Sequence, residues 1–185
     1  FSGFLLFLPQ HTAMALIIIP SLVSNLFQIY GLNFVEIRRF FFEYLLLINS
    51  CFFMVLTTSQ IFLNFSKTFI YGALCIMIFC FLYSQILNVQ FSIKRDNKCA
   101  QFLFGLVSGT FGGITGQWGP PLVIYFFSQN LSSKNIICYQ GIIYSLASSA
   151  LLLGHINSGI FNATLLAVSF PFVLCCLVGQ YFGVL

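Results

Sequence analysis

Residues 105–121 combine a composition suited to the membrane interior with residues that interrupt helices. The segment reads GLVSGTFGGITGQWGPP, holds six of the fourteen glycines, and ends in the pair Pro120-Pro121. Because proline lacks a backbone N–H and clashes with the preceding turn, and glycine tolerates positive φ, we expect a helix break near residues 116 to 121. Non-helical backbone at membrane depth is tolerated where it is buried in protein or lines a polar cavity. The sequence therefore predicts a functional site at this break.

The composition of the chain indicates its class. Of 185 residues, 59% are hydrophobic and 5% are charged, and the mean hydropathy is +1.01. No charged side chain occurs from residue 99 to 133 or from 135 to 185. These stretches predict an all-α, polytopic transmembrane helical bundle within a lipid bilayer. The net charge of +4 is spread over short connections, which excludes a basic face for nucleic acid.

Six hydrophobic segments are long enough to cross a membrane, for which about 20 residues are needed. We predict spans at 11–30, 40–58, 68–88, 100–127, 136–153 and 160–182. The fourth span contains the glycine and proline break. The connections are short, so we expect no soluble domain.

Basic residues indicate the orientation of the bundle. If the connections 31–39 and 89–99 face the cytoplasm, they hold five of the seven Lys and Arg residues. Lys67 and Lys134 then face the other side, and the positive-inside rule favours this arrangement. It requires the broken segment 100–127 to cross once and not to re-enter.

A weak internal repeat divides the chain. Residues 8–14 and the span after them resemble residues 127–133 and their following span, a spacing typical of two-fold transporters. We predict a partial first helical repeat at 1–92 and a second repeat, incomplete at its C-terminus, at 93–185. Residues 1–8 would be the tail of the first repeat's broken segment. The chain begins with Phe, and the third span has no counterpart, so we expect a fragment truncated at both ends.

The same residues carry a resemblance to a known family. The run 112–121, with Gly105 and Gly109 before it, resembles the second-half glycine-rich signature of the sulfite exporter TauE/SafE family. Trp118 stands where the family pattern has the first glycine of a Gly-Gly-Pro ending. The segment PSLVSN from Pro20 resembles the sequence after the first-half motif. The resemblance implies a bacterial inner-membrane permease that moves sulfite, sulfonates or related organosulfur anions.

The candidate substrate-binding residues lie at the break and at matching places in the two halves. A half-helix that begins near Gly119 would offer N–H groups and a positive dipole end to an oxyanion, without a fixed cation. The candidates are Asn25, Gly112, Gly113, Gly116, Gln117, Trp118, Gly119, Pro120, Gln140 and Tyr144.

Each candidate also has a structural interpretation. The glycines share roughly one helical face and could serve only for close helix packing. Asn25 on one span, and Gln140 with Tyr144 on another, could be interhelical hydrogen-bond partners rather than ligands. Trp118 could be a packing residue or a gate.

Other polar residues fit an enzyme or a metal site less well. Glu43 lies four residues after Arg39, close enough to pair with it. His155 lies in a predicted connection, where we expect it to be solvated. The seven cysteines include no Cys-x-x-Cys pair and no His at metal spacing, so we predict neither disulfides nor a metal site. No nucleophile triad or P-loop is visible in the sequence, so we predict that the protein is not an enzyme and needs no cofactor.

The sequence thus predicts a multi-pass inner-membrane transporter with a small anionic substrate and a midplane site. Its energy would come from an ion or substrate gradient, or from a separate subunit. Two alternatives stay open: an anion channel-like conductor and a non-transporting membrane assembly subunit. A homo-oligomer is compatible with the sequence.

Overall fold

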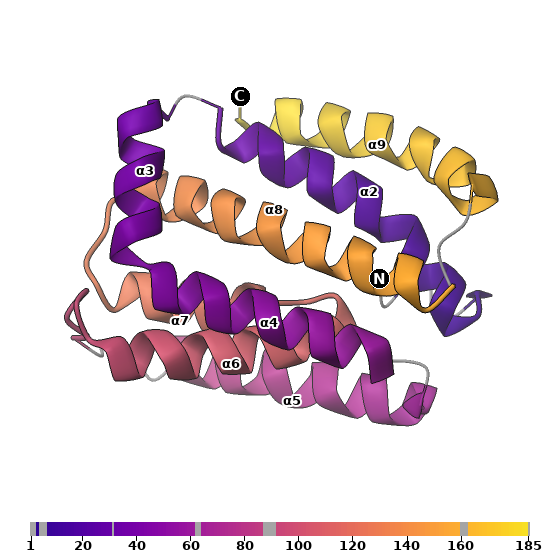
Figure 1. The fold of residues 1–185 in the computed structure, drawn as a ribbon, viewed down its shortest axis with the longest axis horizontal. Helices are drawn as coiled ribbons and strands as arrows, with labels where there is room; N and C mark the ends of the chain where they lie inside the picture. Colours follow the sequence, from indigo (N-terminus) through magenta and orange to yellow (C-terminus); the bar gives the residue numbers. More distant parts are fainter. Residues whose placement is uncertain are drawn as a thin grey trace.

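A bundle of helices makes up the fold. A computed structural model describes residue 3 and residues 7–30, 32–61, 64–86, 92–159 and 163–184. Its helices are α2 (Gln10–Gln28), α3 (Phe34–Glu43), α4 (Leu45–Ile61), α5 (Lys67–Ile86), α6 (Lys98–Thr115), α7 (Gly119–Phe127), α8 (Ser133–Asn157) and α9 (Ala163–Val184). Figure 1 shows the long helices running along one axis, with α3 across their end. The all-α prediction is confirmed. The predicted role of residues 1–8 falls largely outside the described residues.

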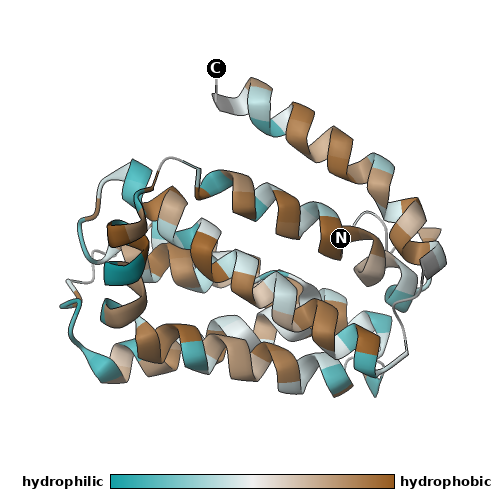
Figure 2. Ribbon diagram, turned by 45° about the horizontal axis from the view of Figure 1, so that its top comes forward, coloured by the Kyte–Doolittle hydropathy of each residue, from teal (hydrophilic) through white to brown (hydrophobic). Residues whose placement is uncertain are grey.

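The hydropathy of the helices agrees with a multi-pass membrane protein. Within the described residues, four helices are long and apolar enough to span a membrane: α2, α5, α8 and α9. The bent pair α3 and α4 would make a fifth span. Apolar residues extend along these helices in Figure 2, and hydrophilic residues are common near the ends of the bundle.

The predicted span at 40–58 is wrong at its start. The chain bends by 78° between α3 and α4, and only α4 runs along the bundle. A capping interaction begins α3, in which the Asn33 N–H donates to Glu36 Oε2 at 2.8 Å, and the Arg38 guanidinium lies 5.6 Å from the centre of the Phe42 ring. The charged and exposed residues of α3 keep this helix at the bundle surface.

The broken segment folds back on itself. α6 ends at Gly116, which has φ +69°, a conformation that glycine adopts without strain. Its N–H donates to Gly112 O at 2.8 Å. Three residues later α7 begins, with Pro120 and Pro121 in its first turn, where a missing N–H removes no helical bond. The predicted break near residues 116 to 121 is therefore present, as the turn of a helical hairpin.

The direction of α7 overturns the single crossing expected for 100–127. The Ser108 hydroxyl, halfway along α6, donates to Trp118 O at 2.7 Å. The Ile93 N–H donates to Ser128 O at 3.2 Å. The chain after α7 therefore returns to the end of the bundle from which α6 started. We call α6, residues 116–118 and α7 the hairpin.

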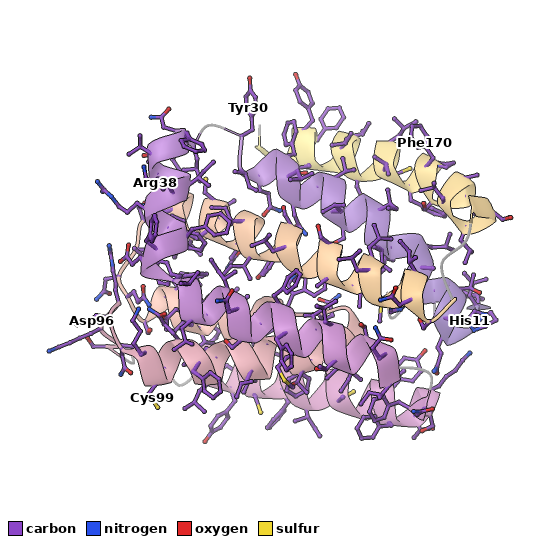
Figure 3. All side chains as sticks on the ribbon, in the orientation of Figure 1. His11, Tyr30, Arg38, Asp96, Cys99 and Phe170 are labelled. Carbon is purple, nitrogen blue, oxygen red and sulfur yellow. The ribbon has the colours of Figure 1, made fainter. Side chains whose placement is uncertain are left out.

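This return moves Lys134 to the end of the bundle opposite to the one predicted. Lys134 is the second residue of α8, close to the end of the hairpin. The same end, which we call the basic end, holds six of the seven basic residues and all three acidic ones. The basic residues there are Arg38, Arg39, Lys94, Arg95, Lys98 and Lys134. Lys67 starts α5 at the opposite end, where its Nζ donates to Leu8 O at 3.2 Å; Figure 3 shows Arg38 and Asp96 at one end and His11 at the other.

Glycines bring α6 into close contact with α4. The positions involved are spaced by four residues, and each faces a backbone carbonyl of α4. A Cβ atom at Gly105, Gly109 or Gly113 would lie 2.7, 2.5 or 3.0 Å from the carbonyl oxygen of Leu47, Cys51 or Val55, respectively. The residue numbers rise together along α6 and along α4, so the two helices are parallel. This small-residue surface lets their backbones approach closely.

The helices of the two predicted repeats exchange partners. α2 packs against α8, where the Ser21 and Ser148 hydroxyls lie 3.4 Å apart. α9 packs against α2 through Gln180, whose Oε1 accepts from the Ser24 hydroxyl at 2.9 Å. α8 in turn packs against α4. The predicted halves thus contact each other along several pairs of helices, namely α2 with α8 and α9, and α4 with α6 and α8. The repeat boundary at residue 92 stays a prediction.

His155 does not lie in a solvated connection. α8 extends to Asn157, beyond the predicted end at residue 153, and His155 is fully buried within it. Gly154 explains the close packing, because a Cβ atom there would overlap the Ser59 hydroxyl of α4. The expectation of a solvated histidine is therefore wrong.

Candidate functional site

The N-terminus of α7 lies inside the bundle, halfway along α6. The hydrogen bond from Ser108 to Trp118 O fixes this depth. The first four N–H groups of a helix have no partner within it. Pro120 and Pro121 have no N–H. Of the first four positions, only Trp118 and Gly119 therefore carry a backbone N–H group without a partner inside α7. These two N–H groups lie at the positive end of the α7 dipole.

Tyr144 of α8 faces this helix start. A Cβ atom at Gly119 would lie 3.3 Å from the Tyr144 hydroxyl oxygen. The rings of Trp118 and Tyr144 are 6.0 Å apart between centroids. The absence of a side chain at Gly119 thus leaves the backbone open toward a hydroxyl donor. The structure brings these three predicted site residues together.

The remaining glycines of the break have packing partners. A Cβ atom at Gly112 would lie 2.8 Å from Trp118 Cε3, so Gly112 makes room for the indole. A Cβ atom at Gly113 would overlap the Thr58 hydroxyl of α4. At Gly116 it would lie 3.0 Å from Met14 Sδ of α2. These contacts favour the packing interpretation for the three glycines, which shape the hairpin around the helix start.

A second polar group lies one helical turn along α8. Ser148 accepts a hydrogen bond from Asn25 Nδ2 at 3.4 Å, and Ser21 accepts another from the same amide at 3.3 Å. Asn25 is buried, and Tyr144 precedes Ser148 by four residues on the same face of α8. Ser21 and Ser148 were not among the predicted site residues, because serines are common in apolar helices and only the spacing of these two from Asn25 and Tyr144 distinguishes them.

Two other predicted site residues lie apart from this group. The Gln117 side chain is exposed, and the backbone N–H of Gln117 donates to the Thr115 hydroxyl at 3.2 Å. Gln140 is partly buried beside Gly141, which packs against α2 near Asn25. Their contact with a ligand stays a prediction.

None of the described residues that surround the start of α7 in the paragraphs above has an ionised side chain. An anion there would interact with N–H groups, hydroxyls and the helix dipole. In the part of the chain that the structure describes, no group of three His, Cys, Asp or Glu side chains could hold a metal ion. The chemistry that the arrangement offers is therefore reversible binding of an anion by neutral donors.

Aromatic rings pack against one another at the basic end of the bundle. Phe40 and Tyr139 have centroids 4.4 Å apart, and Tyr44 and Phe126 meet edge to face at 5.6 Å. The Tyr44 hydroxyl donates to Gln129 Oε1 at 2.5 Å.

Glu43 pairs with a partner other than the one expected. Its carboxylate lies 3.8 Å from the guanidinium of Arg95, in the connection before α6. Pairing with Arg39 was predicted from their spacing along one helix. The bend after Glu43 turns the carboxylate toward the open end of the hairpin, which explains the difference.

The fold and the break together define a class of protein. A multi-pass helical bundle with a discontinuous helix that starts at mid-depth is the construction of secondary transporters. The family model of the sulfite exporter TauE/SafE matches residues 1–185, and the chain belongs to this family. It is therefore a multi-pass membrane protein of a transporter family. No curated protein and no solved structure matches the chain.

Proposed function

We propose that the protein moves small anions, such as sulfite, sulfonates or related organosulfur compounds, across the bacterial inner membrane. One observation carries the proposal: α7 starts halfway along α6, and its first residue, Gly119, lies beside the Tyr144 hydroxyl. Membership of the sulfite exporter family supports the sulfur-containing class of substrate. The substrate would bind at the start of α7.

Binding at this place depends on partial charges. A helix N-terminus carries roughly half a positive elementary charge, and the N–H groups of Trp118 and Gly119 would donate to the oxyanion. The Tyr144 hydroxyl would add a third donor. Without a paired cation, the anion is held weakly enough to leave again, as transport requires.

The charges at the two ends support an orientation. With six of seven basic residues at the basic end, the positive-inside rule favours a cytoplasmic position for that end. Gly116 and the exposed Gln117 then lie toward the other side of the membrane. We propose that Gln117 meets the anion on that side of the break, and that the aromatic rings near Tyr44 separate the site from the cytoplasm.

Flux through proteoliposomes tests the proposal and separates the alternatives. Full-length protein is reconstituted, and initial rates of radiolabelled sulfite and sulfonate uptake are measured under imposed ion gradients. A transporter gives rates that saturate with substrate and respond to one gradient. Rates that do not saturate would favour a channel-like conductor. No flux above empty liposomes would favour a membrane assembly subunit.

A further inference from the structure

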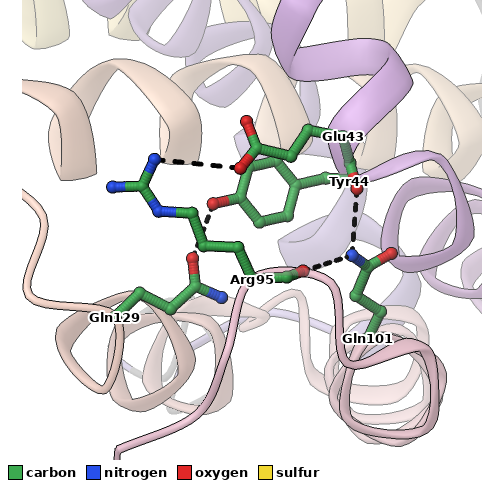
Figure 4. A network of polar contacts seen from close by, with 5 residues as sticks. All are labelled: Glu43, Tyr44, Arg95, Gln101 and Gln129. Atoms are coloured by element: carbon green, nitrogen blue, oxygen red, sulfur yellow. Dashed lines mark hydrogen bonds and ion pairs between the residues drawn. The ribbon is translucent and has the colours of Figure 1, made fainter.

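The open end of the hairpin contains a network of polar side chains far from the proposed anion site. Gln101 Nε2 donates to Glu43 O at 2.9 Å and to Arg95 O at 2.8 Å. Tyr44 donates to Gln129, as described above. Figure 4 shows these contacts, which join the end of α3 and the bend at Tyr44 to the connection before α6, to α6 itself and to the chain after α7.

Three polar atoms in this region are buried and have no hydrogen-bond partner among the described residues. They are Gln101 Oε1, the Tyr125 hydroxyl oxygen and Gln129 Nε2. The residues are 0%, 0% and 8% exposed, respectively. Buried polar atoms are nearly always paired, with protein or with ordered water. Three such atoms in one region therefore point to a ligand.

The three side chains lie around Glu43 and Tyr44. Tyr125 and Gln129 are four residues apart, one helical turn, at the end of α7. Gln129 Oε1 accepts from the Tyr44 hydroxyl and Gln101 Nε2 donates to Glu43 O, so both amides lie beside the same bend of the chain. The Tyr125 ring also meets the Tyr44 ring edge to face at 6.3 Å. Side chains from the two arms of the hairpin thus gather at the bend between α3 and α4.

The chemistry of the three atoms selects the kind of ligand. The amide of Gln101 cannot be turned over, because its Nε2 already donates to two backbone carbonyls. Its Oε1 is therefore an acceptor, and a fully ionised oxyanion, which has only acceptors, would be repelled by it. A metal cation would instead be repelled by the N–H groups of the Gln129 amide. A neutral molecule that both donates and accepts suits all three atoms, and a buried water typically makes about three such bonds.

We propose that Gln101, Tyr125 and Gln129 bind an ordered water molecule that bridges the two arms of the hairpin at its open end. The water donates to Gln101 Oε1, accepts from Gln129 Nε2 and bonds the Tyr125 hydroxyl. It stabilises the closed packing of α7 against α6 beside the Arg95 and Glu43 ion pair. This site does not depend on which substrate the protein moves.

A high-resolution cryo-electron microscopy structure of the full-length protein in lipid nanodiscs tests the proposal directly. The expected result is a density peak within about 2.7–3.2 Å of at least two of the three atoms, which is hydrogen-bond distance. Absence of a peak, with Tyr125 bonded directly to Gln101 or Gln129, would overturn it.

Two substitutions provide an independent measurement in the same protein. Tyr125→Phe is expected to lower the melting temperature more than Tyr139→Phe, whose hydroxyl lies outside the three-residue site. Combined with Gln101→Leu, Tyr125→Phe should have a smaller effect than it has alone, because one water links both side chains. Equal effects of Tyr125→Phe and Tyr139→Phe, or strict additivity with Gln101→Leu, would contradict the bridge. If a variant does not fold, the wild-type density decides.

Discussion

Gly113→Ala probes the contact that holds the hairpin against α4. The new Cβ atom would overlap the Thr58 hydroxyl and lie 3.0 Å from Val55 O. The hydroxyl can rotate away only in part, since Thr58 Cβ itself would be 2.9 Å from the new atom. The helices must therefore move apart.

The magnitude follows from two opposing terms. Overpacking a close contact costs typically about 1–3 kcal/mol, and replacing Gly by Ala inside a helix gains roughly 0.8–1 kcal/mol. The difference is a net loss of stability of up to about 2 kcal/mol at Gly113. Gly179→Ala in α9 is the matched control, because nothing lies within 4 Å of a Cβ atom there. That variant should be as stable as the wild type or slightly more stable.

Thermal unfolding of purified protein, followed by fluorescence size-exclusion chromatography, measures both variants in one detergent. The expected result is a lower melting temperature for Gly113→Ala than for Gly179→Ala. Equal melting temperatures would refute the close parallel packing of α6 on α4.

Two further predictions concern the orientation and the turn of the hairpin. The native cysteines are removed, and single cysteines are placed at Arg95, Lys134 or Lys67. Those at Arg95 and Lys134 should react with an impermeant thiol reagent from the same side of the membrane, and the one at Lys67 from the other side. Reaction of residues 95 and 134 from opposite sides would support a single crossing by residues 100–127. Gly116→Ala should destabilise the protein by about 1–2 kcal/mol, because its φ of +69° forces a side chain into the left-handed region. Gly159→Ala, with φ +71° and nothing within 4 Å of a Cβ atom, is its control for backbone strain alone; a stable Gly116→Ala beside a destabilised Gly159→Ala would show that the turn at residue 116 is not left-handed.

Hydropathy predicted most of the long helices, because a membrane helix must be apolar over its whole length whatever its neighbours are. The helix break was also predictable, since Gly116 and the Pro120-Pro121 pair act through local backbone geometry. The direction of the chain after the break was not. A glycine turn permits a straight crossing or a return, and tertiary contacts such as Ser108 with Trp118 decide between them.

Individual polar residues were harder to place for the same reason. Glu43 and Arg39 have helical spacing, but a bend at Tyr44 carries the carboxylate to Arg95. His155 follows a glycine near the end of an apolar stretch, which the sequence alone presents as a connection. Among the candidate site residues, Gly119 and Tyr144 could be selected from the sequence, yet their proximity follows only from the return of α7.

The most direct test of the anion site compares Tyr144→Phe with Tyr139→Phe in proteoliposome flux. A hydrogen bond to a charged group contributes about 1.5–3 kcal/mol, so loss of the Tyr144 hydroxyl should raise the KM for the transported anion by about tenfold or more. Tyr139→Phe, in the aromatic cluster of the basic end, should leave KM within about twofold, a free-energy change well under 1 kcal/mol. An unchanged KM in Tyr144→Phe, with wild-type flux and folded protein, would contradict binding of the anion at the start of α7.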